Sequence, residues 1–296
     1  MPDYGFLKGT GVALITPFKK DSSIDFDALE KVIEHCILGG VESLVVLGTT
    51  GESVTLSKSE KKELIQFSLK TNRGRAKFIV GIGGNNTAEL VDELLELDPS
   101  GIDAILSSSP AYNKPSQEGI FQHYMAFEKA SPLPIIIYNV PARTASNITA
   151  ETCLRLAHAS EKFAAVKEAS GDLGQATKIL KDRPPHFLVL SGDDPLALGL
   201  MGIGGDGVIS VIANAYPAEF SEMIRSASNG NYTQARLLNQ KLFDLHKWLY
   251  VEGNPAGIKA ACHIKGLCKN ILRLPLVPLS DSNFQNLQLE MNRIGN

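Results

Sequence analysis

The sequence has no excess of positive charge and no long hydrophobic run. It contains 296 residues, with 29 lysines and arginines against 32 aspartates and glutamates, and its formal net charge is −3. Proteins that bind nucleic acids or anionic membrane surfaces usually carry a basic excess, so we expect neither kind of partner. No apolar run approaches the roughly 20 residues that a membrane-spanning helix needs, so we expect no membrane span.

Cysteine and histidine are also scarce. The four cysteines, Cys36, Cys153, Cys262 and Cys268, include no C-x-x-C pair, and only His263 stands near two of them. We therefore expect reduced core cysteines and no metal site. The first residues, MPDYGFLKG, lack the apolar stretch of a secretory signal. Together these features lead us to expect a cytoplasmic protein.

The sequence does contain eight short apolar segments that alternate with helical patterns. The apolar segments cover residues 11–18, 43–47, 78–84, 104–110, 135–140, 163–167, 187–192 and 207–212. Continuous apolar strands of this length are typical of a parallel sheet that is covered on both faces. Eight strand–helix units in about 225 residues predict an α/β fold, a closed parallel (β/α)8 barrel or TIM barrel. An open doubly wound sheet is the alternative.

Capping signals mark where the intervening helices begin. Asp25 can cap the first helix, and Ser57 with Glu60 forms a capping box for the second. Further helices are expected from residue 86 or 87 and over residues 117–130, 149–157, 174–181, 195–201 and 218–227. The segment 202–207 matches G-x-G-x-x-G, but it follows a helix and opens a strand. We therefore interpret it as a turn and not as a dinucleotide-binding motif.

The last part of the chain is helical. Three helices are expected, one containing Trp248, one from about Pro255 to Cys268 and one from about Asp281, and the link LRLPLVPLS holds two prolines that exclude helix. We expect two domains: a barrel over residues 1–228 that carries the active site, and a C-terminal helical accessory region over residues 229–296.

The stretch FAAVKEASGD contains the most informative residue. Lys167 ends an apolar strand, and alternation places it on the same face as Phe163 and Ala165, with Glu168 on the other face. Lys167 could simply extend to solvent or pair with a distant carboxylate. It could also be an amine kept away from water, which favours the neutral form and makes it a nucleophile.

Polar residues at the carboxyl ends of other strands support the second interpretation. In a parallel barrel these ends meet at one face, where catalytic residues collect. The residues found there are Thr49, Thr50, Tyr112, Tyr138, Arg143, Gly192 and Ile209. Taken singly, these residues can also be interpreted without a function, as a plain turn, a core tyrosine and an exposed loop arginine. An amine, phenols, hydroxyls, turn amides and a guanidinium together fit Schiff-base chemistry on a keto acid, which requires no metal or organic cofactor.

The chain resembles the dihydrodipicolinate synthase / N-acetylneuraminate lyase family of pyruvate-handling barrels. The resemblance covers nearly the whole chain and is carried by GTGVALITPF, GTTGES, PSQEG, YNVPART, VKEASGD, LSGDD, GVISV, NPAGIKAA and LRLPLVPLS. It implies that Lys167 is the Schiff-base lysine and that Tyr138 relays protons to and from it. Thr49 matches the hydroxyl linked to that tyrosine. Tyr112 resembles a tyrosine lent across a subunit interface.

The resemblance also implies how substrates are held. Thr50 resembles the residue that binds the pyruvate carboxylate, and Arg143 the one that receives the carboxylate of the second substrate. Gly192 and Ile209 match positions whose backbone borders the site. The family's usual assembly, a homotetramer made of two tight dimers, is expected here on the same basis.

Three functions are compatible with these residues. The first is condensation of pyruvate with aspartate 4-semialdehyde, in diaminopimelate and lysine synthesis. The second is cleavage of N-acetylneuraminate or of a 2-keto-3-deoxy-sugar acid by a lyase of the same family. Sialic acid lyases usually have serine where Thr49 stands and lack an arginine at the position of Arg143, so both residues favour condensation. The third is a non-catalytic binding protein, which would have been expected to lose Lys167 or Tyr138.

A regulatory pocket is a further expectation from the resemblance. In members of the family that lysine inhibits, the effector binds at the dimer interface. The corresponding positions here are Ser53, Val54, Lys58, Lys61, Asn85, Glu89 and Ala111. Lys58 and Lys61 replace histidines, and Ala111 replaces an aromatic residue. We therefore expect weak or absent inhibition by lysine.

Overall fold

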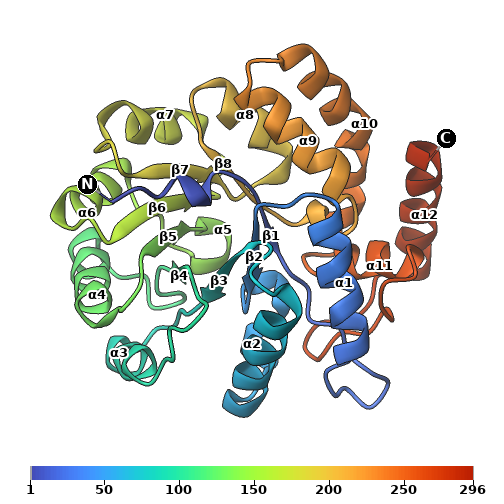
Figure 1. Cartoon of the computed structure of the whole chain (residues 1–296), viewed down its shortest axis with the longest axis horizontal. Coiled ribbons are helices and arrows are strands. Elements are labelled where there is room, and N and C mark those ends of the chain that lie inside the picture. The colour runs from blue at the N-terminus through green and yellow to red at the C-terminus, as the bar shows by residue number, and fades with distance from the viewer. Residues whose placement is uncertain (1, 296) are drawn as a thin grey trace. The chain divides into compact units, whose positions relative to one another are not determined.

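Eight parallel strands close into a barrel in the order in which they follow one another along the chain. The structure is a computed structural model that describes residues 2–295. The strands are β1 (Gly9–Ala13), β2 (Ser43–Val46), β3 (Lys77–Gly81), β4 (Ala104–Ser108), β5 (Ile135–Asn139), β6 (Phe163–Glu168), β7 (Leu188–Ser191) and β8 (Gly207–Ser210) (Figure 1). Every residue of β2, β5, β6, β7 and β8 is buried. The expected (β/α)8 barrel is confirmed, and the open sheet is excluded.

Helices follow the strands as the sequence patterns indicate. They are α1 (Phe26–Leu38), α2 (Lys58–Asn72), α3 (Thr87–Leu95), α4 (Gln117–Ala130), α5 (Pro141–Thr144), α6 (Ala150–Ala159), α7 (Leu173–Asp182), α8 (Ala197–Gly202), α9 (Pro217–Ser228), α10 (Tyr232–Tyr250), α11 (Ala256–Ile264) and α12 (Asp281–Gly295). Asp25 caps α1, and the capping box of Ser57 and Glu60 is present in both directions. Helices α10 to α12 confirm a helical extension after the barrel.

Several strands end earlier than their apolar runs, because side chains accept the backbone N–H groups or because a proline has no N–H to donate. The run 11–18 gives a strand only to Ala13: the Ile15 N–H donates to Asn214 Oδ1 at 3.1 Å, and Pro17 has no N–H. The run 207–212 stops at Ser210, whose hydroxyl accepts the Ala213 N–H at 3.1 Å. Residues 141–143, expected to be a loop, begin the short helix α5.

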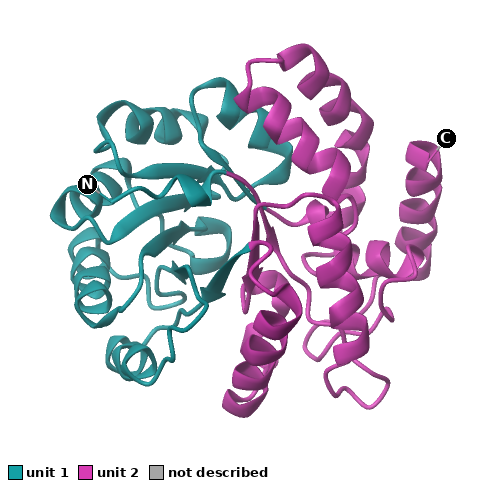
Figure 2. Ribbon diagram, viewed as in Figure 1, with its two compact units in different colours: residues 1–8, 77–209 teal, residues 9–76, 210–296 magenta. Residues whose placement is uncertain are grey.

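The chain forms two compact units (Figure 2). The first contains residues up to Lys8 together with Lys77–Ile209, and so includes β3 to β7. The second contains Gly9–Ala76 and the chain from Ser210 onward, and so includes β1, β2 and helices α9 to α12. Both units have apolar cores, with Tyr124 fully buried in the first and Phe18 in the second. The expected division at residue 228 stays a prediction.

An arginine in the second unit ties three distant segments together. Arg273 donates to the Ser22 carbonyl at 2.7 Å, to the Thr55 carbonyl at 2.8 Å and to Glu60 Oε2 at 3.0 Å. Its hydrogen bond to Glu60 lowers the pKa of that carboxyl to about 2. Glu60 is therefore an anion at neutral pH, and the loop after α11 is anchored to the start of α2.

Candidate active site

Lys167 lies at the end of β6 and is almost completely buried. It is 5% exposed, and its Cα pairs with that of Tyr138 on the neighbouring strand β5. The Lys167 Nζ is 4.2 Å from the centroid of the Tyr138 ring. The pairing skips a residue between Phe163 and Ala165, so the strict alternation assumed for the whole strand holds only from Ala165 onward. The structure thus brings the proposed nucleophile and a phenol together.

Gly192 leaves the space that the Lys167 side chain occupies. A Cβ at Gly192 would come within 3.0 Å of both Cγ and Cε of Lys167 and within 2.6 Å of the Ala169 Cβ. The Gly192 N–H donates to the carbonyl of Glu168 at 2.7 Å, which fixes the distance between the two chain segments. Only glycine fits here without displacing the lysine.

Glu168, which the sequence analysis did not single out as functional, holds the end of β6 in place. Its carboxylate is 6% exposed and accepts from Asn139 Nδ2 at 3.0 Å, Gln175 Nε2 at 2.9 Å and the Ser170 N–H at 2.7 Å. Three neutral donors therefore satisfy a buried carboxylate. The sequence feature that could have indicated this role is Asn139, a polar residue that ends β5 and pairs with Glu168.

Tyr112 and Arg143 lie outside this group, on the segments after β4 and β5. Tyr112 is 90% exposed with a left-handed φ of 69°, and its N–H donates to the Thr144 carbonyl at 3.2 Å. Such a φ is costly for a residue with a side chain, so the surrounding hydrogen bonding must impose it. Arg143 is exposed on α5. Ile209 is buried within β8.

Thr49 and Thr50 belong to the second unit, on the 3-10 turn η2 (Thr49–Gly51). Thr50 is 3% exposed, and its Oγ1 accepts a hydrogen bond from Asn254 Nδ2 at 3.0 Å. A hydroxyl that accepts in this way keeps its own hydrogen available for a ligand. Asn254, in the NPAGIKAA motif, is a further residue whose contact the sequence analysis did not foresee.

The positions of the expected effector pocket are distributed over both units. Ser53 belongs to the 3-10 turn after η2, and Lys58 and Lys61 to the first turn of α2. In the first unit Glu89 lies on α3, and Asn85 Oδ1 accepts the Ala111 N–H at 2.8 Å. That amide oxygen is thus already engaged. Val54 is 93% exposed.

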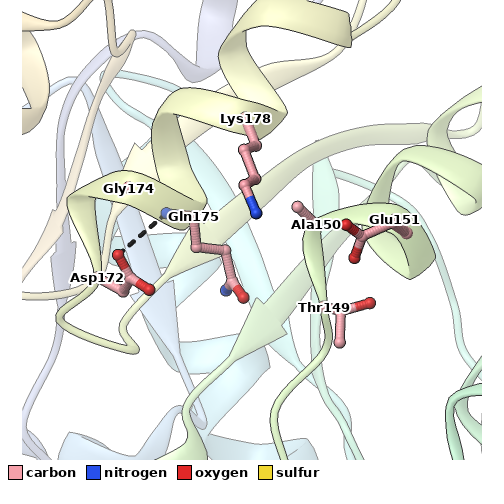
Figure 3. A pocket seen from close by; sticks show the side chains of 7 residues that line it. All are labelled: Thr149, Ala150, Glu151, Asp172, Gly174, Gln175 and Lys178. Carbon is pink, nitrogen blue, oxygen red and sulfur yellow. Dashed lines mark hydrogen bonds between the residues drawn. The ribbon is translucent and has the colours of Figure 1, made fainter.

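A separate cavity of about 350 Å³ lies at the amino ends of α6 and α7 (Figure 3). It is lined by Thr149, Ala150, Glu151, Asp172, Gly174, Gln175 and Lys178. Its lysine, Lys178, is exposed. The cavity contains none of the residues expected to be catalytic, although its Gln175 also donates to Glu168.

Within residues 2–295, no three histidine, cysteine or acidic side chains gather closely enough to hold a metal ion. None of the helices in the same range combines the length and the apolar character of a membrane span.

Comparison with known proteins gives one consistent result. Residues 6–293 match the dihydrodipicolinate synthetase family. The 4-hydroxy-tetrahydrodipicolinate synthase of Parabacteroides distasonis is 49% identical over 282 residues, which is 95% of each chain. The dihydrodipicolinate synthase of Aquifex aeolicus superposes with a TM-score of 0.94 at 40% identity and 98% coverage of both chains. The chloride-inhibited dihydrodipicolinate synthase of Acinetobacter baumannii, solved in complex with pyruvate, superposes with a TM-score of 0.94 at 38% identity. The match covers 98% of this chain and 99% of that chain.

Proposed function

Because the chain belongs to the dihydrodipicolinate synthetase family, we propose that it condenses pyruvate with L-aspartate 4-semialdehyde to give 4-hydroxy-tetrahydrodipicolinate. This reaction belongs to diaminopimelate and lysine synthesis. The observation that carries the proposal is the buried Lys167 with its Nζ 4.2 Å from the centroid of the Tyr138 ring. A related enzyme of Acinetobacter baumannii has been solved with pyruvate.

In the proposed mechanism the neutral Lys167 amine attacks the C2 carbonyl of pyruvate. The new C–N bond forms as the carbonyl oxygen takes a proton, and loss of water then leaves a protonated imine. Removal of a proton from C3 gives an enamine, whose carbon attacks the aldehyde of the second substrate and forms the C–C bond. The amino group of the adduct then attacks C2, which closes the ring and releases Lys167. Tyr138 is the nearest phenol for the proton transfers.

The other residues are assigned to binding and proton relay. Thr50 donates its hydroxyl hydrogen to the pyruvate carboxylate, a role supported by the hydrogen bond that its oxygen already accepts from Asn254. Thr49 and Tyr112 extend the proton relay from Tyr138. Arg143 binds the carboxylate of the semialdehyde, and the backbone at Gly192 and Ile209 borders the site. No cofactor takes part in these steps.

The family membership also supports a proposal for assembly and location. We assign a homotetramer built from two tight dimers, because Tyr112 is 90% exposed in the single chain and held in a left-handed conformation, as a residue lent to a partner would be. We assign a cytoplasmic location because the substrates are metabolites of central biosynthesis. The four unpaired, buried cysteines agree with a reducing compartment.

A coupled assay separates condensation from the lyase reactions. The purified protein is offered pyruvate with aspartate semialdehyde, followed by a reductase that consumes the product, and separately N-acetylneuraminate or a 2-keto-3-deoxy-sugar acid with lactate dehydrogenase to detect pyruvate. We expect turnover only with the semialdehyde, because Thr49 and Arg143 follow the synthase pattern. Lys167→Arg is the inactive control, since arginine stays protonated. Faster release of pyruvate from a sugar acid would identify a lyase instead.

Arg143→Ala should impair use of the semialdehyde and leave pyruvate chemistry intact. Loss of a guanidinium–carboxylate contact of about 2 kcal/mol predicts a fall in kcat/KM for the semialdehyde of roughly 30-fold. Borohydride trapping of pyruvate should proceed at the wild-type rate. Arg155→Ala, which removes a surface arginine paired with Glu118, is the matched control. If trapping and condensation fall together, Arg143 has a general structural role.

Inhibition by lysine should be weak or absent. Lysine is a cation, and each close contact with the ammonium of Lys58 or Lys61 costs about 1 kcal/mol. Those ammonium groups also compete for Glu89, and Ala111 offers no aromatic wall for the methylene chain of the ligand. The test is a titration of lysine into the assay at subsaturating pyruvate. Strong cooperative inhibition would show that the pocket works despite these residues.

A gain-of-function variant sharpens the same test. The triple substitution Lys58→His, Lys61→His and Ala111→Tyr removes both fixed cations and supplies an aromatic side chain. It should increase the affinity for lysine at least tenfold relative to the wild type. Lys62→His, which changes a neighbouring exposed lysine on α2, is the control and should leave the titration unchanged.

A further inference from the structure

The chain buries a second lysine that the proposed mechanism does not use. Lys259, on α11, has no solvent exposure, and its Nζ lies 2.5 Å from Glu52 Oε1, whose side chain is equally buried. The same ammonium donates to the Ile271 carbonyl at 2.9 Å and lies 4.1 Å from the centroid of the Phe18 ring. Because Lys259 is fully buried and its Nζ is already engaged by these groups, we do not assign it a role as a nucleophile.

The partner, Glu52, ends the turn that carries Thr49 and Thr50. Glu52 has a left-handed φ of 53°, and its N–H donates to the Thr49 carbonyl at 3.0 Å. A residue with a side chain adopts this conformation only when its surroundings impose it. The carboxylate is held from two sides, by Lys259 and by the Arg273 N–H, which donates to Oε2 at 3.0 Å. Both donors come from the chain after the barrel strands.

Other contacts fasten the remaining residues of the turn. The Thr16 hydroxyl donates to the Gly51 carbonyl at 2.7 Å, and Asn254 donates to the Thr50 hydroxyl at 3.0 Å. A Cβ on Gly51 would approach the Leu14 carbonyl oxygen to 3.1 Å, so the turn lies directly against the segment after β1. These contacts, together with the ion pair at Glu52, define the orientation of the turn.

A buried ion pair is a costly way to fill space, because both ions lose their hydration. An apolar pair of the same volume would serve packing at least as well. What the ion pair adds is position, since the Lys259 ammonium 2.5 Å from one carboxylate oxygen and the Arg273 N–H on the other hold the carboxylate between them. Glu52 lies at the end of η2. Holding its carboxylate in one position therefore also holds the two residues of this turn that are proposed to bind substrate and to relay protons.

We propose that Glu52 and Lys259 are positioning residues, which hold the turn Thr49–Gly51 so that it can bind pyruvate. This inference rests on the roles proposed above for Thr49 and Thr50. According to this proposal, α11 and the segment around Arg273 support the active site by holding this turn, although neither supplies a reacting group. The chain after the barrel strands thereby acts on the first substrate and not on the second.

The test uses the full-length chain with the pair replaced by neutral side chains, Glu52→Gln with Lys259→Met. Removing both charges together avoids leaving one buried ion unpaired. We expect the double variant to raise KM for pyruvate at least tenfold and to slow borohydride trapping at subsaturating pyruvate by the same factor. KM for the semialdehyde should change less than twofold. A double variant with wild-type KM and trapping rate would overturn the proposal.

Two further variants keep the test decisive. Leu287→Ala creates a cavity at a buried position of α12 in the same unit, so it should lower Tm without changing KM for pyruvate. A comparable rise in KM for Leu287→Ala would show that any loss of stability has this effect and would contradict positioning. If the double variant does not fold, Glu52→Asp replaces it, because it keeps the charge but shortens the side chain by one methylene.

The outcome for Glu52→Asp is equally definite. We expect a rise in KM for pyruvate of at least threefold with the fold retained, and an unchanged KM would overturn the proposal. The wild-type protein separates this inference from the function on which it rests. If the wild type forms no pyruvate adduct at all, the proposed function fails. If the wild type is active and the variants match it, only the positioning role fails.

Discussion

The structure buries two lysines, and the groups that surround each of them differ. Lys259 is surrounded by a carboxylate, a carbonyl and an aromatic ring, so its positive charge is compensated. Lys167 is 5% exposed and lies against the Tyr138 ring, and no carboxylate within residues 2–295 forms an ion pair with it. Burial lowers the pKa of the Lys259 ammonium, and the neighbouring Glu52 carboxylate opposes that shift. We propose a reactive role for Lys167 and a structural role for Lys259.

The surroundings of each lysine follow from this difference. Beside Lys167, Gly192 leaves room for the lysine stem, and the carboxylate of the adjacent Glu168 accepts hydrogen bonds from Asn139 and other neutral donors. Around Lys259 it supplies a carboxylate and fixes a strained turn through it. The barrel sets the positions of the strand ends, but hydrogen bonds after the strands determine which polar groups remain available for a substrate.

Patterns local in the sequence predicted the barrel, the capping box at Ser57 and the limits of α4. Strand ends were less predictable, because the partner of Ile15 is Asn214, 199 residues away. The contact between Asn254 and Thr50 spans 204 residues and leaves no local signal. Lys167 could be singled out because it ends an apolar run, and Tyr138 because it lies near the end of one. Their proposed roles, like those of Thr49, Tyr112 and Arg143, stay predictions that family membership supports.

The central claim is that Lys167, and not the other buried lysine, forms the covalent intermediate. The most direct measurement is peptide mapping by mass spectrometry after the protein is treated with pyruvate and borohydride. The account predicts one reduced pyruvate adduct, on the peptide that contains Lys167, and its loss in Lys167→Arg. The peptide that contains Lys259 should be unmodified, because its ammonium is paired with Glu52. An adduct on Lys259 or on any lysine other than Lys167 would contradict the account.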